Sequence, residues 1–146
     1  SPKVPGVDGE KMSKSYGNTI SLREEDDSIE RKIRTMKTDP RRVRRTDPGN
    51  PDDCPVWDLH RLYSDDDTRA WVREGCTTAG IGCIDCKKPV IEAIQQEQRG
   101  MRERARQYEE QPDLVKAIIA EGSEHARDVA RDTLDEVRRA MGLGYR

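Results

Sequence analysis

Apolar residues recur at helical spacing from Val56 almost to the end of the chain, and this pattern limits the folds open to the sequence. It is clearest near the C-terminus, where small and apolar side chains lie three or four residues apart at Ala126, Val129, Ala130, Thr133, Leu134, Val137, Ala140 and Met141. Such spacing places one apolar stripe on a helix. Since 38% of the residues are charged, 32% are hydrophobic and none is Phe, only thin stripes are available to form a core. The chain is therefore expected to be all-α.

The first helix is predicted from Ser21 onward. Ser21 and Glu24 have the spacing of a capping box, and acidic residues in the first turns precede basic residues in the last, as the helix dipole favours. Pro40 disfavours helical geometry before it, so this helix is expected to end near Lys37. The apolar residues that share one face of it are Ile29, Ile33 and Met36.

A long helix is expected over residues 87–110, with Pro89 in its first turn, where the missing N–H is tolerated. Pro112 is expected to open the next helix and Gly122 to close it. Ser123 would then cap a last helix, which carries the stripe described above. The pattern as a whole predicts a helical bundle over residues 21–146.

Residues 1–20 contain too many Pro and Gly residues for regular structure and are expected to form an irregular loop. Glycines at 6, 9 and 17 allow tight turns with positive φ, and Lys11 and Lys14 lie between them among small hydroxyl residues. Two ammonium groups three residues apart can contact one anionic group, such as a phosphate that gains charge as a bond breaks. A solvated surface loop is the simpler explanation of the Lys-x-x-Lys spacing taken alone.

A second loop, residues 38–55, is rich in Pro, Asp and Gly and carries four arginines within five residues. Such a run usually forms a solvated turn. Beside a helix that ends with Arg34 and Lys37, the same arginines can instead hold a nucleic-acid backbone, because Arg pairs with phosphate in a bidentate way. The net charge of the chain is −2, so any such surface must be a local patch. The four residues are Arg41, Arg42, Arg44 and Arg45.

The four cysteines are Cys54, Cys76, Cys83 and Cys86, with the spacing C-x21-C-x6-C-x2-C. Disulfides are not expected in a highly charged chain without a signal peptide. A zinc ribbon usually has two C-x-x-C knuckles, whereas this chain has one and longer gaps; four thiolates with uneven spacing also suit an iron–sulfur cluster. An iron–sulfur cluster, a zinc ion and four buried thiols are all compatible with this spacing.

No run of residues approaches the roughly 18 apolar residues of a membrane span, and no signal peptide is recognisable. The expected location is the cytoplasm, without a membrane partner. At 146 residues the chain has the size of one domain, and because it starts at Ser1 without Met we expect a fragment of a longer protein.

The stretch Lys11-Met12-Ser13-Lys14-Ser15 resembles the KMSKS signature of class I aminoacyl-tRNA synthetases, flanked by Gly6-x-Asp8-Gly9 and Tyr16-Gly17-Asn18. Further similarity is carried by Lys32-Ile33, Thr38-Asp39-Pro40 and the tail Ala130-x-x-Thr133-Leu134-x-x-Val137-Arg138-x-x-Met141-Gly142-Leu143. With these segments, essentially the whole chain resembles the bacterial tryptophanyl-tRNA synthetase family. Tyrosyl-tRNA synthetases share the fold and the loop, but fit the tail and the Thr-Asp-Pro stretch less well.

This resemblance implies that residues 1–20 end a Rossmann nucleotide-binding domain missing from this chain, and that residues 21–146 form a helical domain that binds the anticodon region of tryptophan tRNA. It implies that Lys11 and Lys14 are catalytic, binding the phosphates of ATP with Mg²⁺ and neutralising the departing pyrophosphate. Met12, Ser13 and Ser15 would support the loop around ATP. The residues expected at tRNA phosphates are Arg34, Lys37, Arg41, Arg42, Arg44 and Arg45.

A subset of the resembled family holds a [4Fe-4S] cluster on four cysteines in this order, so the implied ligands are Cys54, Cys76, Cys83 and Cys86, with zinc as the alternative. The missing half would carry the HIGH signature and the tryptophan pocket; His60 and His125 lie in no HIGH-like string and are expected on helix surfaces. The fragment alone is expected to be inactive, and the full-length protein to be a homodimer. The competing hypothesis is a stand-alone iron–sulfur or zinc-binding interaction module.

Overall fold

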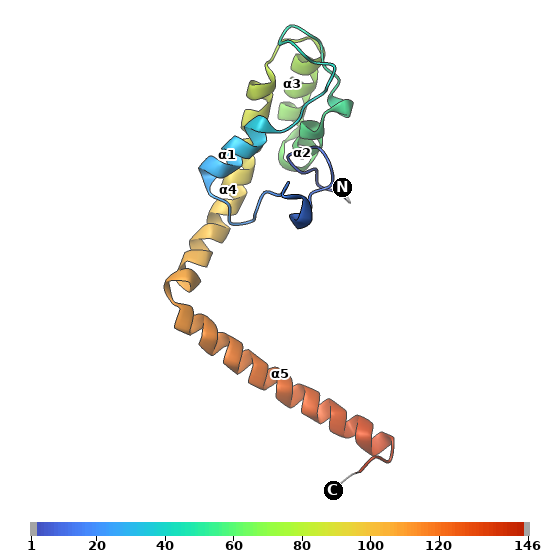
Figure 1. The fold of residues 1–146 in the computed structure, drawn as a ribbon, viewed down its shortest axis with the longest axis vertical. Helices are drawn as coiled ribbons and strands as arrows, with labels where there is room; N and C mark the ends of the chain where they lie inside the picture. Colours follow the sequence, from blue (N-terminus) through green and yellow to red (C-terminus); the bar gives the residue numbers. More distant parts are fainter. Residues whose placement is uncertain (1–2, 145–146) are drawn as a thin grey trace. The chain divides into compact units, whose positions relative to one another are not determined.

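The computed structural model describes residues 3–144 and confirms an all-α fold (Figure 1). Within this range no β-strand forms, and Pro5 and Lys11 make an isolated antiparallel bridge. The chain divides into two compact units, Ser1–Arg102 and Glu103–Arg146, which are described separately. The helices are α1 (Asp26–Thr35), α2 (Pro55–Tyr63), α3 (Asp66–Thr77), α4 (Cys83–Glu110) and α5 (Pro112–Ala140), with 3-10 turns η1 (Lys14–Tyr16) and η2 (Pro51–Asp53).

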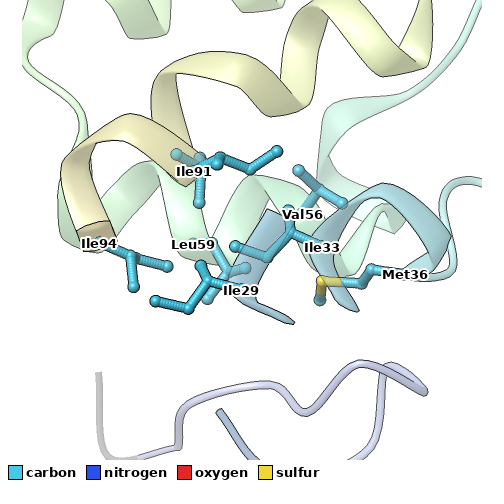
Figure 2. Packing of buried hydrophobic residues seen from close by; sticks show 8 residues of the cluster. Ile29, Ile33, Met36, Val56, Leu59, Ile91 and Ile94 are labelled. Atoms are coloured by element: carbon cyan, nitrogen blue, oxygen red, sulfur yellow. The ribbon is translucent and has the colours of Figure 1, made fainter. Parts of the chain in front are cut away.

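The core of the first unit lies where α1, α2 and the first half of α4 meet. The apolar faces of these three helices point toward one another (Figure 2), as helices with thin apolar stripes must pack to exclude water. The residues of this cluster are Ile29, Ile33 and Met36 from the α1 segment, Val56 and Leu59 from α2, and Val90, Ile91 and Ile94 from α4. The predicted apolar face of the first helix is thereby confirmed.

The start of α1 differs in detail from the predicted capping box. Ser21 lies outside the helix, and Glu25 occupies the N-cap position without a side-chain cap. One half of the box still forms, because the Glu24 carboxylate accepts the Ser21 backbone N–H at 2.7 Å. The same carboxylate pairs with Lys32 at 2.6 Å, so Glu24 ties the approach of the chain to the second turn of the helix.

The end of α1 is held by a lysine from a distant part of the sequence. Lys87 of α4 is buried, and its Nζ donates to the carbonyls of Arg34 at 2.8 Å and Met36 at 2.6 Å. These carbonyls belong to the last turn of a helix and have no intrahelical hydrogen-bond donors. The Lys87 ammonium supplies hydrogen bonds to them, and its positive charge interacts favourably with the negative end of the helix dipole.

Two predicted helix boundaries are wrong. α4 begins at Cys83, so Pro89 lies inside the helix instead of in its first turn. α5 passes through Gly122 and Ser123 without a break and ends at Ala140. Its stop is Gly142, whose φ of +69° allows a Schellman ending in which Leu143 N–H donates to Arg138 O at 2.8 Å. The prediction that Pro112 opens a helix is confirmed.

The second unit consists of the end of α4 and the long helix α5. None of the α5 side chains is buried, and apolar residues such as Ile119, Val129 and Leu134 are exposed. Ion pairs one turn apart, including Lys116 with Asp113 at 2.9 Å, support the helix along its surface. Among the residues described, no helix is both long and apolar enough to cross a membrane.

Candidate functional site

The loop that carries Lys11 and Lys14 has a defined backbone. Gly6 N–H donates to Glu10 O at 2.7 Å, and Gly9 N–H returns to Gly6 O at 2.9 Å. Gly9 has a φ of +86°, a conformation that L side chains avoid. Gly6 is needed for a different reason, since a Cβ there would lie 2.4 Å from the Asn18 side chain. The glycines therefore permit a compact turn that closes over Asn18.

Asn18 is the buried centre of this loop. Its Nδ2 donates to Asp8 Oδ1 at 2.8 Å and to Lys11 O at 3.1 Å, and its Oδ1 accepts the Ser13 N–H at 2.7 Å. The hydrogen bond from Asn18 is the largest cause that lowers the pKa of Asp8 below its ordinary value. One amide side chain thus holds the backbone on both sides of Met12.

The functional groups of the loop project from this support. Lys11 and Lys14 are exposed, and within residues 3–144 neither ammonium group makes an ion pair. The hydroxyls of Ser13 and Ser15 lie 2.8 Å apart, and Gly17 ends the short η1 turn with a φ of +65°. Two unpaired cations beside two hydroxyls form a surface suited to a polyanion.

The loop is fastened to the helical core at several points. Lys32 of α1 donates to Thr19 O at 2.8 Å, and the backbone N–H of Lys37 donates to Val7 O at 3.3 Å. Gly9 packs against the first turn of α2, where a Cβ would lie 2.9 Å from Pro55. The loop and the three-helix core are consequently parts of one unit.

A second loop follows α1 and is organised by Asp39. This buried carboxylate accepts the backbone N–H groups of Arg41 at 2.9 Å and Asn50 at 2.7 Å. The hydrogen bond from Asn50 is the largest cause of the lowered pKa of Asp39. Burial raises this pKa, but interactions with Arg41 lower it further. Asp39 therefore keeps its charge and closes the base of a loop that contains the four arginines.

Arg42 differs from the sequence expectation. It is only 8% exposed, and its guanidinium donates to the carbonyls of Arg45, at 3.1 Å, and Ile81, with a longer contact of 3.9 Å to Cys76 Sγ. A buried guanidinium with these partners is withdrawn from any RNA phosphate. The prediction that Arg42 contacts RNA is accordingly corrected: its role is to join the arginine loop to the segment before α4.

The other predicted cations stay at the surface. Arg41 pairs with Asp53, and Arg34 pairs with Glu30 at 3.3 Å. Surface pairs of this kind are weak, so these side chains remain available to a competing phosphate. The exposed members of the predicted set are Arg34, Lys37, Arg41, Arg44 and Arg45.

The structure brings all four cysteines to one small enclosed cavity. Cys54 is the N-cap of α2, Cys76 lies in the last turn of α3, and Cys83 and Cys86 open α4. The loop at Gly49 approaches so closely that a Cβ there would lie 2.7 Å from Cys76 Sγ. All four sulfurs are free thiols. Residues as far apart as 54 and 86 in sequence therefore line one cavity.

Cys54, Cys76 and Cys86 are stabilised in their neutral thiol form. Burial raises the pKa of Cys54 and Cys76, and burial followed by the neighbouring cysteines raises the pKa of Cys86 to about 12. Backbone N–H groups of Val56 and Trp57 act on Cys54 in the opposite direction. The nearby cations act in the opposite direction, since Arg42 lowers the pKa of Cys76 and Lys87 lowers the pKa of Cys86, but burial outweighs both.

Although the four thiols line one cavity, they do not converge on a metal position. Within residues 3–144 no group of three or more Cys, His, Asp or Glu side chains is placed to hold a metal ion. The cavity is about 20 Å³, close to the space of one water molecule, so a cluster would require the thiols to move apart.

His60 was predicted on a helix surface, and that prediction is wrong. It is fully buried in α2, with Nδ1 2.8 Å from Ser64 Oγ and Nε2 3.0 Å from Cys86 O. Burial lowers its pKa, so the ring is neutral near pH 7. His60 therefore orients the first turn of α4 beside the cysteine cavity, while His125 is exposed as expected.

Comparison with known proteins places this geometry in a family. The family model described as tRNA synthetases class I (W and Y) matches residues 1–98. A tryptophan–tRNA ligase of Ralstonia nicotianae is 60% identical over 143 residues, which cover 98% of this chain and 36% of the relative. The tryptophan–tRNA ligase of Thermotoga maritima is 50% identical over 145 residues, covering 99% of this chain and 44% of that protein.

A solved structure agrees with the sequence comparison. The tryptophanyl-tRNA synthetase of Campylobacter jejuni, crystallised with ADP and tryptophan, matches with a TM-score of 0.80 at 26% identity, covering 96% of this chain and 43% of that one. The chain thus spans less than half the length of these relatives.

Proposed function

The chain belongs to the class I tRNA synthetases of the tryptophan and tyrosine type, and on this premise we propose that it is the C-terminal part of a tryptophan–tRNA ligase. The observation that carries the proposal is the loop built on Asn18, which presents unpaired Lys11 and Lys14 from a KMSKS sequence. Tyrosine is the less favoured amino acid, because the relatives described above are tryptophan–tRNA ligases. The proposed location of this activity is the cytoplasm.

In this proposal, Lys11 and Lys14 contact the phosphates of ATP, bound with Mg²⁺, while tryptophan is activated. Their charge stabilises the departing pyrophosphate more than it stabilises ATP, and this difference lowers the barrier. Ser13 and Ser15 add hydroxyl groups, and Met12 packs the loop when it closes. Residues 1–20 end the nucleotide-binding half, residues 21–146 form the tRNA-binding domain, and the full-length protein is a homodimer.

Pyrophosphate exchange in the full-length protein tests the role of the lysines. Lys11→Ala and Lys14→Ala should each lower kcat by about 100-fold, the usual effect of removing one group that stabilises transition-state charge. Lys116→Ala, an exposed lysine on α5, is the control and should leave kcat unchanged. Equal rates for all three variants would contradict the proposal. The present chain alone should show no tryptophan-dependent exchange.

We propose further that the exposed cations of the arginine loop contact the backbone of tryptophan tRNA near its anticodon. The support is their exposure together with the rigid base that Asp39 gives the loop. Arg44→Ala should reduce the slope of log Kd against log salt by about one, whereas Arg131→Ala on α5 should not change it. An unchanged slope for Arg44→Ala would show that this arginine is not at a phosphate.

We also propose that Cys54, Cys76, Cys83 and Cys86 hold a [4Fe-4S] cluster. The support is the donor set of four thiols around one cavity, next to the buried cations Arg42 and Lys87. Iron and acid-labile sulfide analysis of anaerobically prepared protein tests this. Four irons and a brown colour that Cys76→Ser abolishes are expected. One zinc per chain would overturn the cluster and retain the metal site; no metal would overturn both.

A further inference from the structure

An open hollow lies on the surface of the first unit, beside α3 and the first turns of α4. Its volume is about 410 Å³, within the range of small-molecule sites. Its lining includes Trp71, which is 45% exposed although tryptophan is a residue that folding usually buries. Pro89 adds apolar surface to the same lining.

Charged residues also line the hollow. Arg45 and Lys88 contribute two cations to the lining, and Asp85 and Glu92 contribute two carboxylates. Lys88 Nζ lies 3.0 Å from Asp85 Oδ1, a surface pair that a stronger ligand can exchange. An exposed aromatic face with both cations and acceptors beside it matches a nucleotide, which offers a π-face, a phosphate and amino or ring N–H donors.

Part of the lining of the hollow is held in place by Arg42. This buried guanidinium donates to the carbonyls of Arg45 and Ile81, and both residues line the hollow. Gly80, the neighbour of Ile81, also lines the hollow, and any side chain there would meet Thr78 Oγ1 at 3.1 Å. Arg42 therefore holds together two segments, distant in sequence, that both line the hollow.

We propose that this hollow receives one unpaired base of the bound RNA, which stacks on the indole of Trp71 while Arg45 and Lys88 contact the flanking phosphates. The proposal rests on the proposed function, since the RNA is the anticodon loop of the tRNA. It adds a contact that the arginine loop cannot make, because phosphates fix position while a stacked base requires a single strand.

Binding of a stem-loop RNA with the tryptophan anticodon, measured with the chain described here, tests the proposal. Trp71→Ala should weaken binding by about ten-fold, the usual loss for one stacked base, without changing the salt dependence. Trp71→Phe should retain most of the affinity. Tyr108→Ala, an aromatic with a nearly equal exposed fraction of 46%, is the matched control and should bind like the wild type.

An abasic scan of the loop identifies the base and separates stacking from altered folding. Removing one particular base should weaken RNA binding by the wild-type chain about as much as Trp71→Ala weakens binding of the intact RNA. In the Trp71→Ala variant, removing the same base should cause no further loss of affinity. The RNA should also quench tryptophan fluorescence in the wild type and not in Trp71→Phe, because Trp57, the other tryptophan, is buried.

The outcomes distinguish this proposal from the one on which it rests. If the wild-type chain binds the stem-loop with a steep salt dependence and Trp71→Ala binds equally well, the stacking site is wrong and the tRNA-binding role stands. A second outcome also excludes the stacked base: Trp71→Ala weakens the binding of every abasic RNA by the same factor as it weakens the binding of the intact RNA. If the wild-type chain does not bind the RNA, both proposals fail.

Discussion

The amide of Asn18 and the carboxylate of Asp8 meet at 2.8 Å at the base of the KMSKS loop, ten residues apart in sequence. The same amide binds Lys11 O and the Ser13 N–H, so the two residues on either side of Met12 are held by one side chain. Gly6 makes room for it, because any Cβ there would overlap Asn18. The positions of the two lysines therefore depend on a residue that itself carries no charge.

Replacing Asn18 should loosen the loop before it affects the helices. Asn18→Ala removes three hydrogen bonds from a buried position and should lower the free energy of unfolding by about 2 kcal/mol. In the full-length enzyme it should also lower kcat for pyrophosphate exchange. Urea unfolding followed by far-UV circular dichroism gives the first quantity. A variant as stable and as active as the wild type would show that Asn18 does not hold the loop.

Asn18→Asp separates the hydrogen bonds from the charge. This change keeps the shape but places a second carboxylate beside Asp8, so the two repel when both are ionised. The variant should be destabilised at neutral pH and recover as the pH falls into the range where carboxylates protonate. The Asn18→Ala variant, which adds no charge, should show no such recovery. Parallel pH profiles for the two variants would contradict this account.

Patterns that repeat within one element could be predicted from the sequence. Ile29, Ile33 and Met36 were assigned to one buried face by spacing alone, and the structure places them in the core. Lys11 and Lys14 were likewise assigned to an exposed loop by the glycines around them. In both cases the deciding information lies within a few residues, where helical period and glycine geometry act.

Features that depend on distant partners could not be predicted. The four arginines of residues 41–45 look alike in sequence, but only Arg42 is buried. Its partners Cys76 and Ile81 lie 34 and 39 residues away, so local sequence could not distinguish it. His60 is buried because Ser64 and the Cys86 carbonyl satisfy both ring nitrogens. For Cys54, Cys76, Cys83 and Cys86 the spacing left a cluster, zinc and plain thiols open, and only the fold shows that all four line one cavity.

Glu24 should make stability depend on pH. Burial opposes its ionisation, but hydrogen bonds from Lys32, Ser28 and the Ser21 N–H outweigh burial and lower its pKa below 4.5. A lowered pKa in the folded state stabilises the fold above pH 4.5, and this contribution is lost as the pH falls through the folded pKa. Glu24→Gln should therefore cost about 1 kcal/mol at pH 7, because Lys32 is partly exposed and screened, and nothing in strong acid. Chemical unfolding at several pH values measures this difference, and an equal cost at all pH values would contradict it.

Lys87 should be more important for stability than its neighbour Lys88. Lys87→Met removes a buried ammonium group and leaves the carbonyls of Arg34 and Met36 without partners, so it should cost about 3 kcal/mol. Lys88→Met loses only a surface pair with Asp85 and should change the free energy of unfolding by less than about 0.5 kcal/mol. Equal effects in urea unfolding would mean that Lys87 does not hold the end of α1.

Gly122 and Gly17 offer a test of backbone geometry without a change in packing, because a Cβ at either position meets no atom within 4 Å. Gly122 lies inside α5, where Gly is a poor helix former, so Gly122→Ala should stabilise that helix by about 1 kcal/mol. Gly17 has a φ of +65°, so Gly17→Ala should instead destabilise the loop by about 1 kcal/mol. Thermal melts followed by far-UV circular dichroism should move in opposite directions for the two variants. A shift in the same direction would show that open space, and not φ, decides the effect of a methyl group at these positions.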